Sequence, residues 1–294
     1  MPAHILNGEA FANAIHRETA LRVSTLSKRG ITPNLVFIRV GEDPASRAYV
    51  SRKESRAKEV GISSTTLVLP DSTPLPDLLR QIDTLNNDPK VHGILIQSPL
   101  PSAFPNDVVY ARVSPAKDVD GFHPINFGKL LLGDPTGFVP CTPAGIVEIL
   151  RLGKIPTVGK HAVIVGRGQI VGRPLAALLA RKSPGADCTV TLTHSASVDL
   201  PSLTRQADIL IAAIGRPLFL TKEHVRPGAT VIDVGVNRIA DPATPRGYRL
   251  VGDVDFASVS NVAGAITPNP GGVGPMTIAL LLSNTVRSAE DASR

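Results

Sequence analysis

A glycine-rich turn is the part of this chain whose residue types and spacing point most directly to chemistry. It lies in the stretch HAVIVGRGQIVGRP, residues 161–174. Ala162 to Val165 have the apolar pattern of a buried parallel strand, and Pro174 suits the first turn of a following helix. Three glycines lie between them, namely Gly166, Gly168 and Gly172. Such glycines allow a tight turn, a close backbone approach to a pyrophosphate and close helix packing, so the stretch predicts a dinucleotide site.

The side chains around this turn favour a phosphorylated dinucleotide. The next predicted strand, Cys188 to Leu192, is followed by Thr193, His194 and Ser195, and not by the acidic residue that binds a ribose 2′-hydroxyl. Arg167 and Ser195 would offer a 2′-phosphate a cation and a hydroxyl donor, so we expect NADP. The glycine spacing is one residue longer than the commonest fingerprint, and the motif alone leaves open a plain turn with solvated neighbours.

Two side chains on another predicted helix could form a reactive site. Tyr49 and Lys53 are four residues apart in a helix expected from Ala45 to Val60, so they share one face. The same Tyr-x-x-x-Lys pair occurs in short-chain dehydrogenases, but there it follows the dinucleotide motif. Here it precedes the motif, which excludes that class. From spacing alone, a solvated lysine beside a half-buried tyrosine is an equal alternative.

Three polar residues at predicted turns complete the candidate set. Gln97 ends a predicted strand, at the carboxyl edge where open α/β sheets bind ligands. Its neutral amide could hydrogen-bond an amine, or could simply cap a loop. Asp118 and Asp120 lie on a turn marked by Gly121, and the usual role of turn aspartates is structural.

The elements that must position these residues alternate between helix and strand. The pattern predicts helices over 9–28, 45–60 and 75–85, and strands over 35–40, 66–69 and 92–97. Residues 99–137 are rich in Pro, Gly and Asp, and a helix over 142–152 then leads to the glycine motif. Further strands are expected over 209–214 and 231–234, and a last helix over 276–287. The alternation predicts parallel sheets in two α/β domains, with a boundary near Phe138 and the last helix returning to the first domain.

Composition excludes several classes of protein. The 294 residues are 43% hydrophobic and 19% charged, which is typical of a globular protein. No basic leader and no apolar run of membrane-spanning length occur, so we expect a cytoplasmic protein without membrane contact. Cys141 and Cys188 are too far apart to indicate a metal cluster, and we expect both in the core. The net charge of +6 favours acidic small ligands, since the basic residues are scattered and aromatics are few.

In its ordered motifs the chain resembles the bifunctional methylenetetrahydrofolate dehydrogenase/cyclohydrolase family. The resemblance runs from about Gly41 to Arg287. The matching motifs, each given with its first residue, are GEDPASRAYVSRKES (Gly41), QSPLP (Gln97), KDVDGF (Lys117), PCTP (Pro140), VGRGQIVGRP (Val165), VIDVGVNR (Val231), GDVDF (Gly252) and TPNPGGVGPMT (Thr267).

This resemblance implies an activity and a set of residue roles. The activity is NADP-dependent oxidation of 5,10-methylenetetrahydrofolate to the methenyl cation, then hydrolysis to 10-formyltetrahydrofolate, in one-carbon metabolism and purine biosynthesis. Lys53 would be the cyclohydrolase catalytic residue, with Tyr49 shaping the folate pocket, Gln97 bonded to Lys53 and Asp120 holding the pterin. Pro270, Gly271 and Gly274 would also line the substrate site. The cofactor would contact Gly166, Arg167, Gly168, Ile170, Val171, Gly172, Arg173, Ser195, Ile214, Gly215 and Val236.

The resemblance also implies an architecture and a homodimer. Residues 1–137, joined by the C-terminal helix 270–294, would form the folate-binding catalytic domain, and residues 138–269 a Rossmann-like NADP-binding domain. Three positions depart from the family pattern: Ser98 stands for a usual Leu, Gly168 for a common Ser, and Asn269 for an apolar residue. We expect Ser98 and Asn269 to make the pocket rim more polar, and Gly168 to remove one phosphate contact.

Three alternatives to the bifunctional enzyme remain. The first is a family member with dehydrogenase activity alone, against which the presence of both Lys53 and Gln97 counts. The second is a catalytically silent folate- or nucleotide-binding regulator. The third is a nucleic-acid-binding protein, indicated only by the pI of about 9.5. A salt-dependent retardation assay would reveal the third, since such binding depends on phosphate contacts.

Overall fold

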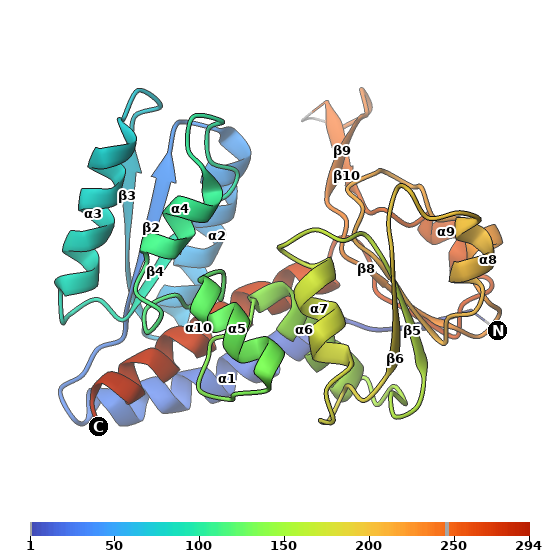
Figure 1. Cartoon of the computed structure of the whole chain (residues 1–294), viewed down its shortest axis with the longest axis horizontal. Helices are drawn as coiled ribbons and strands as arrows, with labels where there is room; N and C mark the ends of the chain where they lie inside the picture. Colours follow the sequence, from blue (N-terminus) through green and yellow to red (C-terminus); the bar gives the residue numbers. More distant parts are fainter. Residues whose placement is uncertain (1, 245–246) are drawn as a thin grey trace. The chain divides into compact units, whose positions relative to one another are not determined.

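Two parallel sheets organise the chain, each in its own compact unit (Figure 1). The structure is a computed structural model that describes residues 2–244 and 247–294. The small-sheet unit contains Asn13–Cys141 and Ile278–Arg294, and the large-sheet unit contains Met1–Ala12 and Thr142–Thr277. The predicted two-domain α/β class with a parallel sheet is confirmed.

The strand order of the small sheet creates a switch point between two of its strands. Its strands β2 (Asn34–Val40), β3 (Ser63–Leu69) and β4 (Gly93–Ile96) are all parallel, in the order β3-β2-β4. The chain runs from β2 to one neighbour and then crosses to the other side. The carboxyl ends of β2 and β4 therefore form a topological switch point, where open α/β sheets bind ligands.

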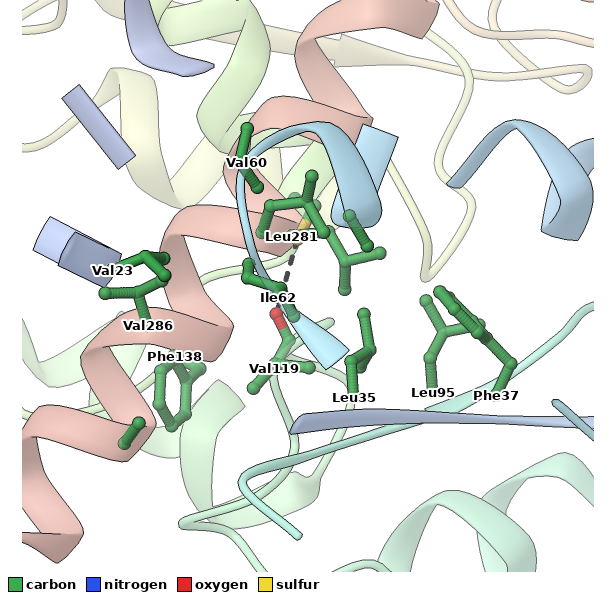
Figure 2. Close-up of a cluster of buried hydrophobic side chains, with 14 of the residues drawn as sticks. Val23, Leu35, Phe37, Val60, Ile62, Leu95, Val119, Phe138, Leu281 and Val286 are labelled. Atoms are coloured by element: carbon green, nitrogen blue, oxygen red, sulfur yellow. Dashed lines mark hydrogen bonds between the residues drawn. The ribbon is translucent and has the colours of Figure 1, made fainter. Parts of the chain in front are cut away.

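Both faces of the small sheet are covered, as the apolar run of β2 requires. Leu35 and Phe37 pack with residues of α1 (Gly8–Ser27), α2 (Pro44–Glu59) and α10 (Val273–Ala292). Figure 2 shows part of this core cluster, including Leu35 and Phe37 of β2 and Leu281 of α10. The alternate residues Val36 and Ile38 pack with α3 (Leu75–Asn87) and α4 (Asn106–Arg112). Strand periodicity thus assigns each β2 side chain to one of two cores.

Local signals explain where the helix carrying Tyr49 and Lys53 begins and ends. The Asp43 side chain accepts a hydrogen bond from Ser46 N at 2.7 Å, and Pro44 occupies the first turn. Gly61 follows the helix with a φ of +85°, a conformation that glycine adopts without strain. At the end of the chain, α10 packs beside α1, since the Arg22 guanidinium donates to Glu290 at 2.8 and 3.0 Å. The expected return of the last helix is confirmed for Ile278–Arg294.

The large sheet has six parallel strands in the order β1-β11-β8-β7-β5-β6. These strands are β1 (His4–Ile5), β5 (His161–Val165), β6 (Thr189–Thr193), β7 (Ile209–Ala212), β8 (Thr230–Asp233) and β11 (Ala265–Ile266). Because β6 and β7 lie on opposite sides of β5, the switch point of this sheet falls between β5 and β7. An antiparallel hairpin, β9 (Asn237–Ala240) and β10 (Tyr248–Val251), belongs to the same unit.

Short helices complete both units, and several of them differ from the sequence prediction. The helices not yet named are α5 (Pro124–Leu132), α6 (Cys141–Leu152), α7 (Gly172–Leu179), α8 (Leu200–Thr204), η1 (Lys222–His224) and α9 (Phe256–Val259). No helix was predicted over 99–137, where α4 and α5 form. In α5 the side chains of Ile125, Leu131 and Leu132 are exposed, so its pattern is not that of a core helix. The last helix is longer than expected, because it begins at Val273 and ends at Ala292.

The two compact units have their own bounds in the chain. Phe138 and Cys141 are buried in the core of the small-sheet unit, whose first segment ends at Cys141, close to the boundary expected near Phe138. The first twelve residues lie in the large-sheet unit, because β1 pairs with β11. Of the C-terminal helix, Ile278 onward belongs to the small-sheet unit. Across the described ranges, no helix combines the length and apolar character needed to span a membrane.

Candidate functional site

Lys53 and Gln97 meet at the switch point of the small sheet. Lys53 is on α2, which follows β2, and Gln97 directly follows β4. The Lys53 amine Nζ donates to Gln97 Oε1 at 3.1 Å. Two further bonds hold the buried Gln97: its backbone N–H donates to Ile38 O at 2.8 Å, and its Nε2 donates to Ser98 O at 2.5 Å. The second bond uses the amide nitrogen, so the amide oxygen is the atom turned to the lysine.

Electrostatics link Lys53 to Asp120 and Cys141. Burial lowers the pKa of Lys53, against the charge of Asp120 and the Cys141 thiol, which raise it. Burial raises the pKa of Asp120, against the opposing effects of Lys53 and a hydrogen bond with Cys141. Burial also raises the pKa of the Cys141 thiol, so the sulfur stays protonated. The site therefore holds an amine that loses its proton more readily than an exposed lysine does.

The two aspartates of the turn have different roles. Asp118 is structural: its carboxylate accepts from Phe122 N at 3.1 Å, His123 N at 2.8 Å and Asn126 Nδ2 at 2.8 Å. These bonds fix the turn before α5. Asp120 instead interacts with the Lys53 amine and the Cys141 thiol. The neighbouring Gly121 has a φ of +80°, and a Cβ there would lie 2.5 Å from Pro140 N, so only glycine allows this path.

Asp118 should make stability depend on pH. Burial raises its pKa from 3.8 to about 7, against the donors that lower it. The folded state therefore binds this proton more tightly than the unfolded chain, and the stabilisation is present at low pH and is lost as pH rises through about 7. We expect the difference in unfolding free energy between the natural protein and Asp118→Asn to fall by as much as about 4 kcal/mol from about pH 4 to about pH 8. Denaturant unfolding at several pH values measures it, and a difference that is constant or grows with pH contradicts this prediction.

Two further side chains of α2, Tyr49 and Ser46, lie on the same side of the helix as Lys53. Tyr49 lies one helical turn before Lys53 and is 38% exposed, so its ring is available to a ligand. Ser46, one turn earlier again, is buried, and its hydroxyl has no hydrogen-bond partner within residues 2–244 and 247–294. Ser46 had no predicted role, although its spacing of three and seven residues from Tyr49 and Lys53 was a usable signal.

The glycine turn has the close contacts that its motif predicts. Gly166 has a φ of +121°, and a Cβ there would lie 2.0 Å from Ala213 O. A Cβ on Gly172 would lie 1.9 Å from Gly166 O. Both positions therefore need glycine, and the loops after β5 and β7 touch at the switch point. Gly168, by contrast, has open space around its Cβ position.

The predicted cofactor side chains lie around this turn. Arg167, Ile170, Arg173 and Ser195 are exposed, and Arg173 N closes the turn by donating to Gly168 O at 3.1 Å. Val171, which precedes α7, gives no side-chain cap to that helix. The Arg173 N–H is used by its bond to Gly168 O and Pro174 has no N–H, so the first turn of α7 leaves the N–H of Gly172 for an anion such as a pyrophosphate.

Buried carboxylates hold the other cofactor loops. Asp253 accepts from Ile214 N at 2.7 Å, from Gly215 N at 2.9 Å and from Asn237 Nδ2 at 2.8 Å. Asp233 accepts from Gly235 N at 3.0 Å, directly before the exposed Val236, and burial raises its pKa to about 6. Both aspartates lie in motifs that carry the family resemblance, but neither had a predicted role.

The remaining predicted residues lie in the large-sheet unit. Pro270 and Gly274 are exposed, and Gly271 O accepts from Glu9 N at 3.1 Å. The polar departures from the family pattern are engaged internally. Ser98 shares a 2.5 Å hydrogen bond with the Tyr110 hydroxyl, and Asn269 Nδ2 donates to Gly235 O at 2.5 Å. The structure thus brings together Lys53, Gln97 and Asp120, and separately gathers the glycine turn with Ile214 and Gly215.

Taken together, the fold and these two sets of residues define a dinucleotide-dependent α/β enzyme with a separate lysine site. Residues 6–120 match the model of the tetrahydrofolate dehydrogenase/cyclohydrolase catalytic domain, and residues 140–293 match that of its NAD(P)-binding domain. The chain belongs to the tetrahydrofolate dehydrogenase/cyclohydrolase family. The predictions of family, fold class and enzyme class are confirmed.

Individual relatives are similar to this chain over nearly its whole length. The Bifunctional protein FolD 1 of Myxococcus xanthus is 53% identical, with 98% of each chain covered. A FolD structure from Campylobacter jejuni is 44% identical, with a TM-score of 0.92 and 98% of this chain and 99% of that one covered. The Trypanosoma brucei enzyme, solved with NADP cofactor and an inhibitor, is 37% identical, with a TM-score of 0.94 and 100% and 99% covered.

Proposed function

We propose that the chain oxidises 5,10-methylenetetrahydrofolate with NADP and hydrolyses the methenyl product to 10-formyltetrahydrofolate, with Lys53 as the base of the second step. The observation that carries the proposal is the lysine amine that is bonded to Gln97, linked to Asp120 and shifted to a lower pKa. The family of the chain supports the reaction, and the contacts of Lys53 support the role proposed for it.

The hydrolysis needs a proton acceptor beside the methenyl carbon. A neutral Lys53 amine can take a proton from water as the water oxygen bonds to that carbon. The carbon's bond to one ring nitrogen then breaks, and that nitrogen takes up a proton. Burial lowers the pKa of Lys53, and the positive charge of the substrate would lower it further. The Gln97 oxygen keeps the amine in place, while the alternative, in which a protonated Lys53 polarises the substrate, predicts the opposite pH dependence.

Substrate binding would use Asp120 and Tyr49. The two oxygens of the Asp120 carboxylate match the adjacent N–H donors of a pterin. The partly exposed ring of Tyr49 offers an apolar face for the folate. Pro270, Gly271 and Gly274 are proposed as further substrate-binding residues.

The glycine turn fits NADP by its own geometry. The backbone packs so closely at Gly166 and Gly172 that a Cβ on either residue would clash with a carbonyl oxygen. The N-terminus of α7 has no side-chain cap. We assign the pyrophosphate to this turn and the 2′-phosphate to Arg167 and Ser195, with Ile170, Val171, Arg173, Ile214, Gly215 and Val236 as further contacts. NADP held by these residues would supply the hydride acceptor for the oxidation.

Gly168→Ser should strengthen NADP binding. The Cβ position at Gly168 has no heavy atom within 4 Å, so a serine fits without displacing its neighbours. Its hydroxyl would restore a hydrogen bond to a charged phosphate, worth about 1–3 kcal/mol. We expect the dissociation constant for NADP, measured by calorimetry, to fall by about fivefold to a hundredfold. A weaker affinity in Gly168→Ser would show that the phosphate does not pass this residue.

The alternatives are less consistent with these observations. A dehydrogenase without the hydrolase, or a silent binding protein, would have no need of a partly buried lysine held by an amide. We further propose that the protein is a cytoplasmic homodimer, and that the folate-binding domain and the NADP-binding domain correspond to the small-sheet and large-sheet units.

One assay tests the reaction and the cofactor together. Methylenetetrahydrofolate is supplied with NADP or with NAD, and absorbance follows the methenyl compound as it forms and decays. The proposal predicts faster formation with NADP, followed by enzyme-dependent decay. Equal rates with both dinucleotides would refute the cofactor preference, and formation without decay would leave only the dehydrogenase.

A further inference from the structure

One amide on the last helix reaches the peptide that carries Asp120. Asn284 of α10 donates from Nδ2 to Val119 O at 2.9 Å, and the same nitrogen lies 3.6 Å from Cys141 Sγ. The Cys141 thiol also donates to Val119 O, at 3.3 Å. Figure 2 shows this carbonyl, with a dashed bond ending on its oxygen. Asn284 therefore contacts both the residue before Asp120 and the Cys141 thiol, which acts on the pKa of the Asp120 carboxyl.

Neighbouring residues of α10 hold the same segment at other points. Ser288 Oγ donates to Ala116 O at 2.8 Å and to His92 O at 2.5 Å. Arg287 donates to Gly137 O at 2.8 Å, and its guanidinium lies 4.0 Å from the centre of the Phe138 ring. These contacts hold the chain at Ala116, before Asp120, and at Gly137, after it. Only Asn284, among these three, is bonded to the peptide next to Asp120.

We propose that Asn284 is a positioning residue for the folate and hydrolase site, acting by fixing the Val119 carbonyl and the Cys141 thiol so that Asp120 faces Lys53. This inference rests on the proposed roles of Asp120 and Lys53. The planar peptide unit places the Asp120 Cα in one plane with the Val119 carbonyl, so holding that carbonyl fixes the point from which the Asp120 side chain extends. Without the Asn284 amide, Val119 O keeps only the thiol, which is a weak donor, and the backbone that carries the Asp120 carboxylate is held less firmly.

Asn284→Leu is the direct test, since leucine has a similar size but no donor. We expect kcat/KM for hydrolysis of methenyltetrahydrofolate to fall by about tenfold to a hundredfold, as expected for a displaced reacting group. The KM for the folate should rise, while the dissociation constant for NADP should not change. Ser288→Ala is the matched control, because it removes α10 hydrogen bonds that do not adjoin Asp120. Asn284→Ala is the second variant, and thermal unfolding of all three identifies any general loss of stability.

The pH profile separates positioning from general support. The groups that act on the Lys53 amine are Asp120 and Cys141, and Asp120 raises the lysine pKa. Weakening that contact should move the acid limb of the hydrolysis profile to lower pH in both Asn284 variants, and leave it in place in Ser288→Ala. An unmoved limb, or equal losses in the Asn284 variants and the control, would overturn the inference. Lys53→Met distinguishes this failure from failure of the proposed function. If the Asn284 variants fail the test and Lys53→Met hydrolyses normally, the proposed function fails as well. If the Asn284 variants fail the test and Lys53→Met is inactive, only the role of Asn284 is refuted.

Discussion

Lys53→Met should lose hydrolysis of methenyltetrahydrofolate, by about 10²–10⁴-fold in kcat, because methionine fills a similar volume but cannot accept a proton. The Gln97 amide would lose its partner, and Asp120 would lose its charged neighbour. NADP binding should not change, because the glycine turn belongs to the large-sheet unit, whereas Lys53 belongs to the small-sheet unit. Preformed methenyltetrahydrofolate, followed by its absorbance, measures the step without the preceding oxidation.

Lys58→Met provides the control for this experiment. Lys58 lies on the same helix, near its C-terminus, and is exposed. Its substitution removes the same charge without touching Gln97 or Asp120, so hydrolysis should continue at the natural rate. Normal turnover in Lys53→Met, with an unchanged fold, would refute the assignment of Lys53 as the base.

The second large effect is expected from Gly172→Ala. The added Cβ would lie 1.9 Å from Gly166 O and 3.0 Å from Arg167 Cα, so the turn and the start of α7 must separate. Such overpacking costs about 1–3 kcal/mol. If the same free energy is lost from NADP binding because the pyrophosphate contacts move, the dissociation constant for NADP should rise by about fivefold to a hundredfold. Calorimetric titration with NADP measures this change, and oxidation should fall with it.

Gly168→Ala is the matched variant in the same turn. Its Cβ would enter open space, and its φ lies outside the left-handed region, so NADP affinity should stay close to that of the natural protein. Equal affinities in Gly172→Ala and Gly168→Ala would mean that the pyrophosphate is not held by this turn.

Short-range patterns made much of the fold predictable. The glycine motif, the caps of α2 and the apolar run of β2 all act within a few residues of each other. The predicted helices and strands therefore agree with the structure to within a few residues. The strands β1 and β11 contain two residues each and pair across the length of the chain, so no periodic pattern could reveal them.

The candidate site was less accessible to sequence reasoning, because its contacts are long-range. Lys53 and Gln97 are 44 residues apart, and spacing alone left both with a structural alternative. Cys141 was correctly expected in the core, but its proximity to Asp120 and Lys53 depends on tertiary packing. Asn284 and Val119 are separated by 165 residues. The two turn aspartates look alike in sequence, and only their partners distinguish Asp118 from Asp120.

A direct titration of Lys53 tests the central claim that burial makes this amine a usable base. The protein is labelled with 13C at lysine Cε, the Lys53 signal is assigned by its absence in Lys53→Met, and its chemical shift is followed with pH. A pKa below the ordinary value of 10.5, coinciding with the acid limb of the hydrolysis profile, is the predicted result. A Lys53 amine that titrates at or above 10.5 would contradict the account.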